Sequence, residues 1–135
     1  YPYAGTGNVR GTCALMSTLH TWEKNVVQPA AQRHLSSPIA KITEMGTFSC
    51  RDIAGSNRPS EHSKGNAIDI GGFVLKNGQK ITVLDDWGKN TPAGRFLREV
   101  YSGSCQVFNG VLGPNYNAAH KNHFHLDVGP YRMCN

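Results

Sequence analysis

The stretch that decides the fold spans residues 60–73 and reads Ser-Glu-His-Ser-Lys-Gly-Asn-Ala-Ile-Asp-Ile-Gly-Gly-Phe. Its second half predicts a β-strand over residues 66–73. Because successive side chains of a strand point to opposite faces, Ile68 and Ile70 share one face and Asp69 lies on the other. We therefore expect one face of this strand to be apolar and the other to present a carboxylate.

Hydrophobic spacing and turn residues place the other elements around this strand. The apolar side chains of Leu15, Leu19, Trp22 and Val26 recur at helical spacing and indicate a buried helix face. We predict helices over residues 12–27, over 29–35 with Pro29 in the first turn, and after the cap Thr91-Pro92. We predict strands over residues 38–48 (one strand or a hairpin), 107–112 and 123–128. A hairpin is predicted over 75–81, with Asn-Gly at its tip. Helices before and between antiparallel strands indicate an α+β domain with a small antiparallel sheet flanked by helices.

Length and charge restrict the class of protein. A chain of 135 residues buries one core, so we expect a flexible N-terminal arm over 1–11 and a single domain over 12–135. The net charge of +5 suits an acidic polymer such as a cell wall, and it would also suit nucleic acid. No arginine cluster or aromatic platform favours nucleic acid, and no apolar stretch has the length needed to cross a membrane. We therefore expect a monomer that binds cell-wall material, with no nucleic-acid partner and no transmembrane segment.

The four cysteines, Cys13, Cys50, Cys105 and Cys134, form no Cys-x-x-Cys pair, which disfavours a zinc-thiolate site. Two disulfides in an exported protein explain an even number of separated cysteines better. Three pairings are possible, and we expect Cys13–Cys134 to join the ends of the domain and Cys50–Cys105 to join its core.

Histidines gather in two places that suit metal binding. His62 and Asp69 stand seven positions apart, and His120, His123 and His125 follow near the C-terminus. Catalytic zinc sites take three such imidazole or carboxylate ligands and leave the fourth position to water. Strand alternation points His123 and His125 the same way, so one can bind the metal while the other works beside it. We predict one Zn²⁺, bound by His62, Asp69 and His125 in a cleft on the sheet; the alternative is a surface histidine and a strand pair that bind no metal.

These motifs also resemble those of known zinc peptidases. The pattern Ser-x-His-x-x-Gly-x-Ala-x-Asp at 60–69 is similar to the first zinc motif of the peptidoglycan D-alanyl-D-alanine peptidases. The pattern His-x-x-His-x-His at 120–125 resembles the closing motif of the same superfamily, which includes penicillin-insensitive murein endopeptidases, lysostaphin-type enzymes and hedgehog signalling domains. A closer resemblance, to the bacterial extensin-like C-terminal domain family, spans nearly the whole chain through Cys13, Trp22, residues 28–31, 47–51, 60–69, 96–98, 111–114, 123–127 and 131–134.

The resemblance implies roles for residues around the zinc. His123 would stand beside the zinc-bound water and transfer protons, and His120 would share or orient that role. Arg51 would face the scissile carbonyl or a substrate carboxylate, and Ser60 would contact substrate; the alternatives are a surface salt bridge for Arg51, a turn-shaping role for Ser60 and a solvated loop position for His120. Some D-Ala-D-Ala peptidases place a catalytic Glu where this chain has Asn122, which accepts no proton at neutral pH. The chain therefore resembles the branch of the superfamily that uses histidine.

Asp127 shares the expected strand face with His123 and His125. This placement predicts a hydrogen bond between the Asp127 carboxylate and a ligand histidine. A charge at the rim of the site is the alternative.

Residues and resemblance together predict a bacterial zinc peptidase, periplasmic or secreted, that hydrolyses stem-peptide or cross-link amide bonds of peptidoglycan with a zinc-activated water. We expect a D,D-type endopeptidase or carboxypeptidase. The alternative is a non-catalytic, zinc-containing module that binds the cell wall, because hedgehog-like relatives show that a zinc site does not require peptidase activity. The sequence leaves open whether the bond is D,D or L,D and whether cleavage is internal or terminal.

Overall fold

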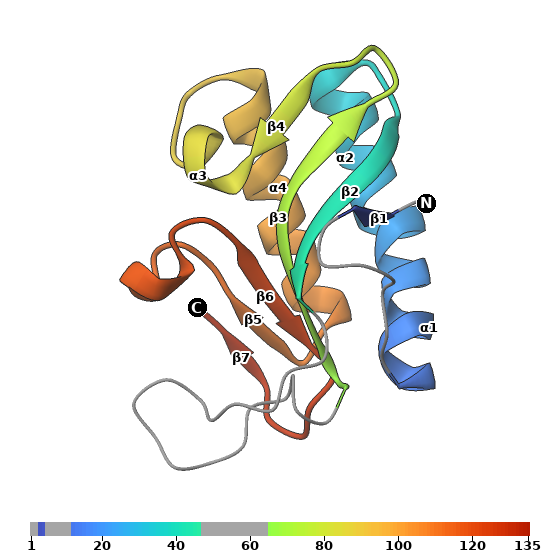
Figure 1. The fold of residues 1–135 in the computed structure, drawn as a ribbon, viewed down its shortest axis with the longest axis vertical. Helices are drawn as coiled ribbons and strands as arrows, with labels where there is room; N and C mark the ends of the chain where they lie inside the picture. The colour runs from blue at the N-terminus through green and yellow to red at the C-terminus, as the bar shows by residue number, and fades with distance from the viewer. Residues whose placement is uncertain (1–2, 5–11, 47–64) are drawn as a thin grey trace.

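The computed structural model describes residues 3–4, 12–46 and 65–135, which form a mixed sheet with helices packed against one face (Figure 1). The helices are α1 (Cys13–Trp22), the π-helix η1 (Glu23–Val27), α2 (Gln28–Leu35), α3 (Val83–Asp86), α4 (Pro92–Val107) and the 3-10 turn η3 (Ala118–His120). The strands are β1 (Tyr3–Ala4), β2 (Ile39–Gly46), β3 (Ala67–Leu75), β4 (Lys80–Thr82), β5 (Gly110–Leu112), β6 (Phe124–Asp127) and β7 (Met133–Cys134). The predicted α+β class is confirmed.

The sheet is mixed, where the sequence predicted an antiparallel one. Its order is β1-β2-β3-β6-β5-β7, with β4 also paired to β3. The inner pairs are antiparallel, but β1 runs parallel to β2 and β7 runs parallel to β5. Both parallel strands are two residues long and join an outer edge of the sheet. Such short edge strands reach their partners through long connections and leave no hairpin signal in the sequence.

The first helical run continues from Cys13 to Leu35, where two helices were expected. The predicted boundaries are close to the observed ones, but a π turn joins the two halves. In this turn the Gln28 N–H donates to the carbonyl of Glu23, five residues earlier. Pro29 then falls in the first turn of α2, where its missing N–H interrupts no α-helical hydrogen bond. The proline is therefore accommodated without ending the helix.

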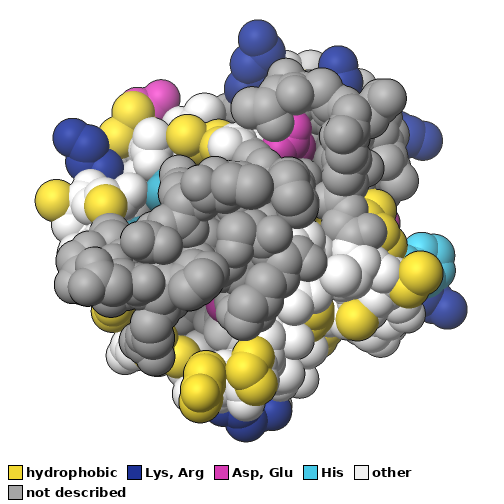
Figure 2. Space-filling model, turned by 60° about the horizontal axis from the view of Figure 1, so that its bottom comes forward, with side chains coloured by type: hydrophobic (Ala, Val, Ile, Leu, Met, Phe, Trp, Pro, Cys, Tyr) yellow, Lys and Arg dark blue, Asp and Glu magenta, His cyan; other side chains and the backbone are white. Residues whose placement is uncertain are grey.

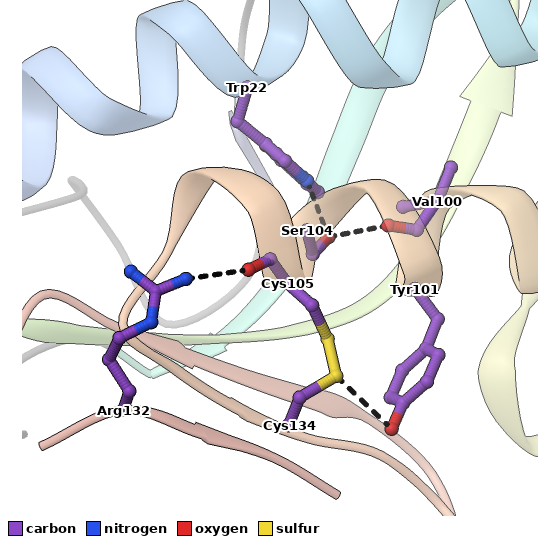
Figure 3. The surroundings of a disulfide bond; sticks show 7 residues. All are labelled: Trp22, Val100, Tyr101, Ser104, Cys105, Arg132 and Cys134. Atoms are coloured by element: carbon purple, nitrogen blue, oxygen red, sulfur yellow. Dashed lines mark hydrogen bonds between the residues drawn. A yellow bond between two sulfur atoms is a disulfide. The ribbon is translucent and has the colours of Figure 1, made fainter.

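Trp22 lies at the centre of the core, between the helices and the sheet. Its side chain is fully buried, with ring centroids 6.3 Å from Phe73 and 6.1 Å from Phe108. The indole Nε1 donates to Ser104 Oγ at 2.8 Å, and this hydroxyl donates to the Val100 carbonyl at 2.6 Å (Figure 3). The polar atom of the tryptophan is thus satisfied inside an apolar core, which confirms the predicted core role of Trp22.

Helix α4 confirms the predicted cap but extends further than the sequence indicated. Thr91 Oγ1 accepts a hydrogen bond from the first turn, as expected of an N-cap. The helix continues to Val107, and the Phe108 N–H still donates to the Ser104 carbonyl at 2.8 Å. The strand predicted over 107–112 is therefore wrong in its first half, and only β5 remains of it.

A disulfide joins Cys105 of α4 to Cys134 of β7 (Figure 3). The predicted pairs Cys13–Cys134 and Cys50–Cys105 are therefore wrong. The reason is the parallel edge strand β7, which brings Cys134 beside the last turn of α4 and not beside the start of α1. Cys13 is exposed and makes no disulfide within the part of the chain that the structure describes, and Cys50 lies outside that part. Pairing of all four cysteines stays a prediction, and it now requires Cys13–Cys50.

Loss of the Cys105–Cys134 bond should destabilise the fold by about 3.6 kcal/mol, the chain-entropy value for closing a loop of this length. The bond spans a sequence separation of 29. Urea unfolding of Cys105→Ser measures the change. Cys134→Ser and the double variant should lose the same amount, because each removes the same bond. A double variant that loses twice as much as either single variant would contradict this assignment.

The described surface gives no sign of a membrane helix or of a basic cluster on the face drawn in Figure 2. Among the described residues, no helix combines the length and apolar character needed to span a bilayer. On the face in Figure 2, the described Lys and Arg side chains are scattered around the outline.

Candidate metal centre and histidine cluster

The candidate site lies on the face of β3 and β6 that points away from the helices. Asp69 of β3 and His125 of β6 are direct cross-strand partners. The side chains that alternate with them belong to the hydrophobic core: Ile68, Ile70, Phe124 and Leu126. The predicted alternation of both strands is confirmed, and it presents the carboxylate and the imidazole on one face.

A β-bulge at Gly71 separates the site-bearing half of β3 from its other half. The pairing with β2 shifts between Thr43 and Glu44, so that Gly71 is the extra residue of β3. The residues before the bulge pair with β6, and those after it pair with β4. The bulge therefore marks the end of the ladder that carries Asp69.

Asp69 and His125 meet at a distance that suits a shared metal ion. His125 Nδ1 lies 3.3 Å from Asp69 Oδ1, and the aspartate is only 4% exposed. Two ligands of a tetrahedral zinc ion, with bonds of about 2.0–2.1 Å, are separated by about 3.3 Å. The donor types and their spacing thus fit two corners of such a site. The same spacing also fits a proton held between imidazole and carboxylate.

The second ring nitrogen of His125 is held by Asp127, as the sequence predicted. His125 Nε2 donates to Asp127 Oδ2 at 2.7 Å. In a neutral imidazole, a proton on Nε2 leaves the lone pair on Nδ1, the nitrogen that faces Asp69. Metal-binding histidines commonly donate their other N–H to a carboxylate in this way.

His123 lies near the other oxygen of the Asp69 carboxylate. Its Nε2 lies 3.7 Å from Asp69 Oδ2, and its Nδ1 is 2.8 Å from the Asn122 side-chain oxygen. That contact requires Nδ1 to donate, which places the lone pair of a neutral ring on Nε2. Asn122 thus contacts the histidine that lies beside Asp69.

His120, in the 3-10 turn η3, packs against both other histidines of the motif. Its ring centroid is 4.9 Å from that of His123 and 6.3 Å from that of His125. The His120 Nδ1 is 2.7 Å from the Asn117 side-chain oxygen, and the exposed Tyr116 ring lies edge-on at 5.4 Å. The structure therefore brings His120, His123 and His125 together around one face of Asp69.

The two carboxylates control the protonation of His125. Burial alone would lower the pKa of this histidine, but hydrogen bonds to Asp127 and Asp69 and the charges of both raise the pKa to about 9. In the metal-free protein the ring is therefore an imidazolium at neutral pH, shared between two carboxylates. A metal ion at Nδ1 has to displace that proton.

Zinc binding should accordingly tighten with pH, by about one power of ten per pH unit up to pH 9, because it releases the His125 proton. Chelator competition between pH 6.5 and 9 measures the slope. The metal-free fold should respond in the opposite sense. The raised pKa of His125 stabilises the metal-free fold fully at pH values below the unfolded pKa of about 6.5. This stabilisation is lost as the pH rises toward 9. A zinc affinity that is flat over this range would remove His125 from the ligand set.

Three of the predicted site residues lie outside the described part of the chain: His62, Ser60 and Arg51. Among the described residues, no group of three or more His, Cys, Asp or Glu is arranged to hold a metal ion. The ligand set of Asp69, His125 and His62 therefore stays a prediction. The predicted cleft around this set stays a prediction as well. A hollow of about 360 Å³ on the helical layer, lined by residues of η1, α2 and α4, contains none of the cluster.

Sequence reasoning missed two supporting residues of the cluster. Asn117 hydrogen-bonds His120, and Gly110 of β5 lies against the Asp127 carboxylate. The signal for Asn117 was weak, because it lies three positions before its histidine in an irregular loop. The role of Gly110 depends on which strand neighbours β6, and the sequence did not specify that neighbour.

The comparison with protein families finds one match. The family model described as "Extensin-like protein C-terminus" matches residues 4–135. Comparison with curated proteins and with solved structures gives no match. Because the family model covers nearly the whole chain, this protein belongs to the extensin-like protein C-terminus family.

Proposed function

We propose that this protein is a zinc-dependent peptidase that cleaves amide bonds in the stem peptides or cross-links of peptidoglycan. The observation that carries the proposal is the cross-strand pair Asp69–His125, whose side-chain atoms lie 3.3 Å apart with His123 beside them. The similarity of residues 60–69 and 120–125 to the motifs of D-Ala-D-Ala peptidases supports the substrate class. The net charge of +5 suits an anionic wall polymer.

The ligands of the proposed site are Asp69 and His125, together with His62. A zinc ion bound there would act as a Lewis acid and lower the pKa of a bound water toward about 7. The described residues contribute a preformed half of the site, because β3–β6 pairing fixes Asp69 opposite His125. Asp69 is buried, so its carboxylate is held in a low-dielectric setting where its charge attracts a cation strongly.

His123 is the proposed general base and acid. Asn122 holds the proton of its Nδ1, so Nε2 can accept a proton from the attacking water and deliver it to the leaving amine nitrogen. The His120 ring packs against the His123 ring. By resemblance, Arg51 would donate to the substrate carbonyl or carboxylate, for which a fixed, permanently charged guanidinium is suited, and Ser60 would contact the substrate.

We also propose that the protein works in the periplasm or outside the cell. The Cys105–Cys134 disulfide supports this location, because such bonds persist in oxidising compartments. Peptidoglycan lies in the same compartment, so location and proposed substrate agree.

The deciding experiment is digestion of purified sacculi, followed by mass analysis of the released muropeptides. The zinc-loaded protein should release products that carry one added water per cleaved amide, and a chelator should stop their release until zinc is restored. The His123→Ala protein serves as the matched inactive sample. Binding to sacculi without any new product would reject the peptidase and favour a zinc-containing wall-binding module.

A further inference from the structure

The Asp127 carboxylate is held by contacts with two strands and a turn, and we call this set of contacts its seat. Its Oδ2 accepts from His125 Nε2 at 2.7 Å, and its Oδ1 accepts from the Gly129 backbone N–H at 3.0 Å. The residue is 9% exposed. Both oxygens are therefore engaged by donors, and the carboxylate is fixed relative to β6.

Gly110 of the neighbouring strand β5 leaves the space that this carboxylate fills. Gly110 and Asp127 are paired in register, on strands that run side by side (Figure 1). A Cβ atom at Gly110 would lie 2.3 Å from Asp127 Oδ2 and 2.4 Å from Oδ1. These distances are too short for any side chain at this position, so only glycine permits the observed carboxylate.

We propose that Asp127, seated on Gly110, is the positioning residue that fixes the ring tautomer of His125 and thereby offers Nδ1 to a zinc ion beside Asp69. The inference rests on the zinc site of the proposed function and does not depend on which bond is cleaved. It assigns Gly110 a role through Asp127, because the glycine contacts the carboxylate and not the histidine.

The chemistry of the seat explains why a carboxylate is required. A carboxylate only accepts, so it can serve the Gly129 N–H and the His125 N–H at the same time. An asparagine has one accepting and one donating atom. It can satisfy both neighbours only by accepting from Gly129 and donating to His125 Nε2, which moves the ring proton to Nδ1. In the neutral ring, the form that binds a metal, the nitrogen that faces Asp69 would then carry a proton in place of a lone pair.

The near-isosteric variant Asp127→Asn separates positioning from packing. It should bind Zn²⁺ about 10- to 100-fold more weakly in competition with a chromophoric chelator, the usual effect of losing such a partner. The comparison is made at a fixed pH above the His125 pKa of about 9, where no ring proton competes with the metal in either protein. Its metal-free thermal midpoint and circular dichroism should stay close to those of the unchanged protein. Asp85→Asn, which removes the same charge from an exposed position on α3, should bind zinc as the unchanged protein does.

A double-variant cycle tests whether Gly110 acts through Asp127. Gly110→Ala should weaken zinc binding in the unchanged background, because its methyl group displaces the carboxylate. In the Asp127→Ala background the added methyl group has space, so Gly110→Ala should weaken zinc affinity by no more than about 2-fold. Such a departure from additivity is expected only of residues that act through each other. Equal losses in both backgrounds would overturn the role of Gly110.

The outcomes distinguish this inference from the proposed function. Zinc binding by the unchanged protein, with normal affinity in Asp127→Asn, would overturn the positioning role and leave the peptidase proposal standing. Weakened binding in Asp127→Asn, with no cleavage of sacculi by any sample, would support the positioning role and reject the peptidase. Failure of the unchanged protein to bind zinc would overturn both. If Asp127→Asn fails to fold, Gly110→Ala decides: normal zinc affinity in that variant overturns the inference.

Discussion

Alanine in place of Asp69 or His125 should leave the protein without zinc after dialysis. The two side chains come from paired strands, and their facing atoms are 3.3 Å apart, the separation of adjacent ligands around a small tetrahedral ion. A site with three protein ligands that loses one of them keeps too few bonds to offset dehydration of the ion. Elemental analysis of the dialysed proteins should give one zinc per chain for the unchanged protein and none for either variant. His62→Ala should behave in the same way.

Two control variants guard this result. His20→Ala removes an exposed histidine from the last turn of α1 and should keep its zinc. His120→Ala should also keep zinc, because His120 is not among the proposed ligands. Full zinc content in His125→Ala would show that the metal lies elsewhere. Full content in His62→Ala alone would keep the described pair and reject the third ligand.

The His123→Ala protein should keep its zinc and its fold but cleave peptide about 10²- to 10⁴-fold more slowly, the usual effect of losing a general acid–base. His123 Nε2 lies 3.7 Å from Asp69 Oδ2, and its Nδ1 is bound by the Asn122 side-chain oxygen. One nitrogen is thus fixed by the protein and the other faces the proposed metal ligand Asp69, as the proposed role requires. Initial rates on sacculi, compared with zinc content of the same samples, measure both expectations.

Loss of metal in His123→Ala would make His123 a ligand and remove one member of the predicted set. Full activity with full metal content would place the base elsewhere, and His120→Ala is then the next variant to assay. Glu61 is the remaining carboxylate candidate near the first motif.

Local patterns were enough to predict much of the fold. The alternation over residues 66–73 predicted β3 and its buried face, and Thr91-Pro92 predicted the start of α4. The two edge strands and the disulfide could not be predicted, because their partners are distant in sequence and no local spacing encodes a parallel pair. The Cys105–Cys134 bond depends on the position of β7, so an even cysteine count could not select it.

The same division holds for the candidate site. Alternation along two strands predicted that Asp69, His123 and His125 would share a face, and it predicted the contact with Asp127. Alternation does not give the register between strands, which places Asp69 directly opposite His125. The contact between Gly110 and the Asp127 carboxylate could not be predicted, because it depends on which strand lies beside β6.

The bulge at Gly71 has a practical consequence for engineering this domain. On one edge of β3, the residues before the bulge belong to the ladder with β6, and those after it belong to the hairpin with β4. The hairpin tip at Asn77–Gly78 is exposed and ends a ladder separate from the one that presents Asp69. Exposed tips of this kind tolerate insertions. A fluorescent reporter or a surface tether grafted there would enlarge the loop that closes the β3–β4 hairpin and leave the β3–β6 ladder in register.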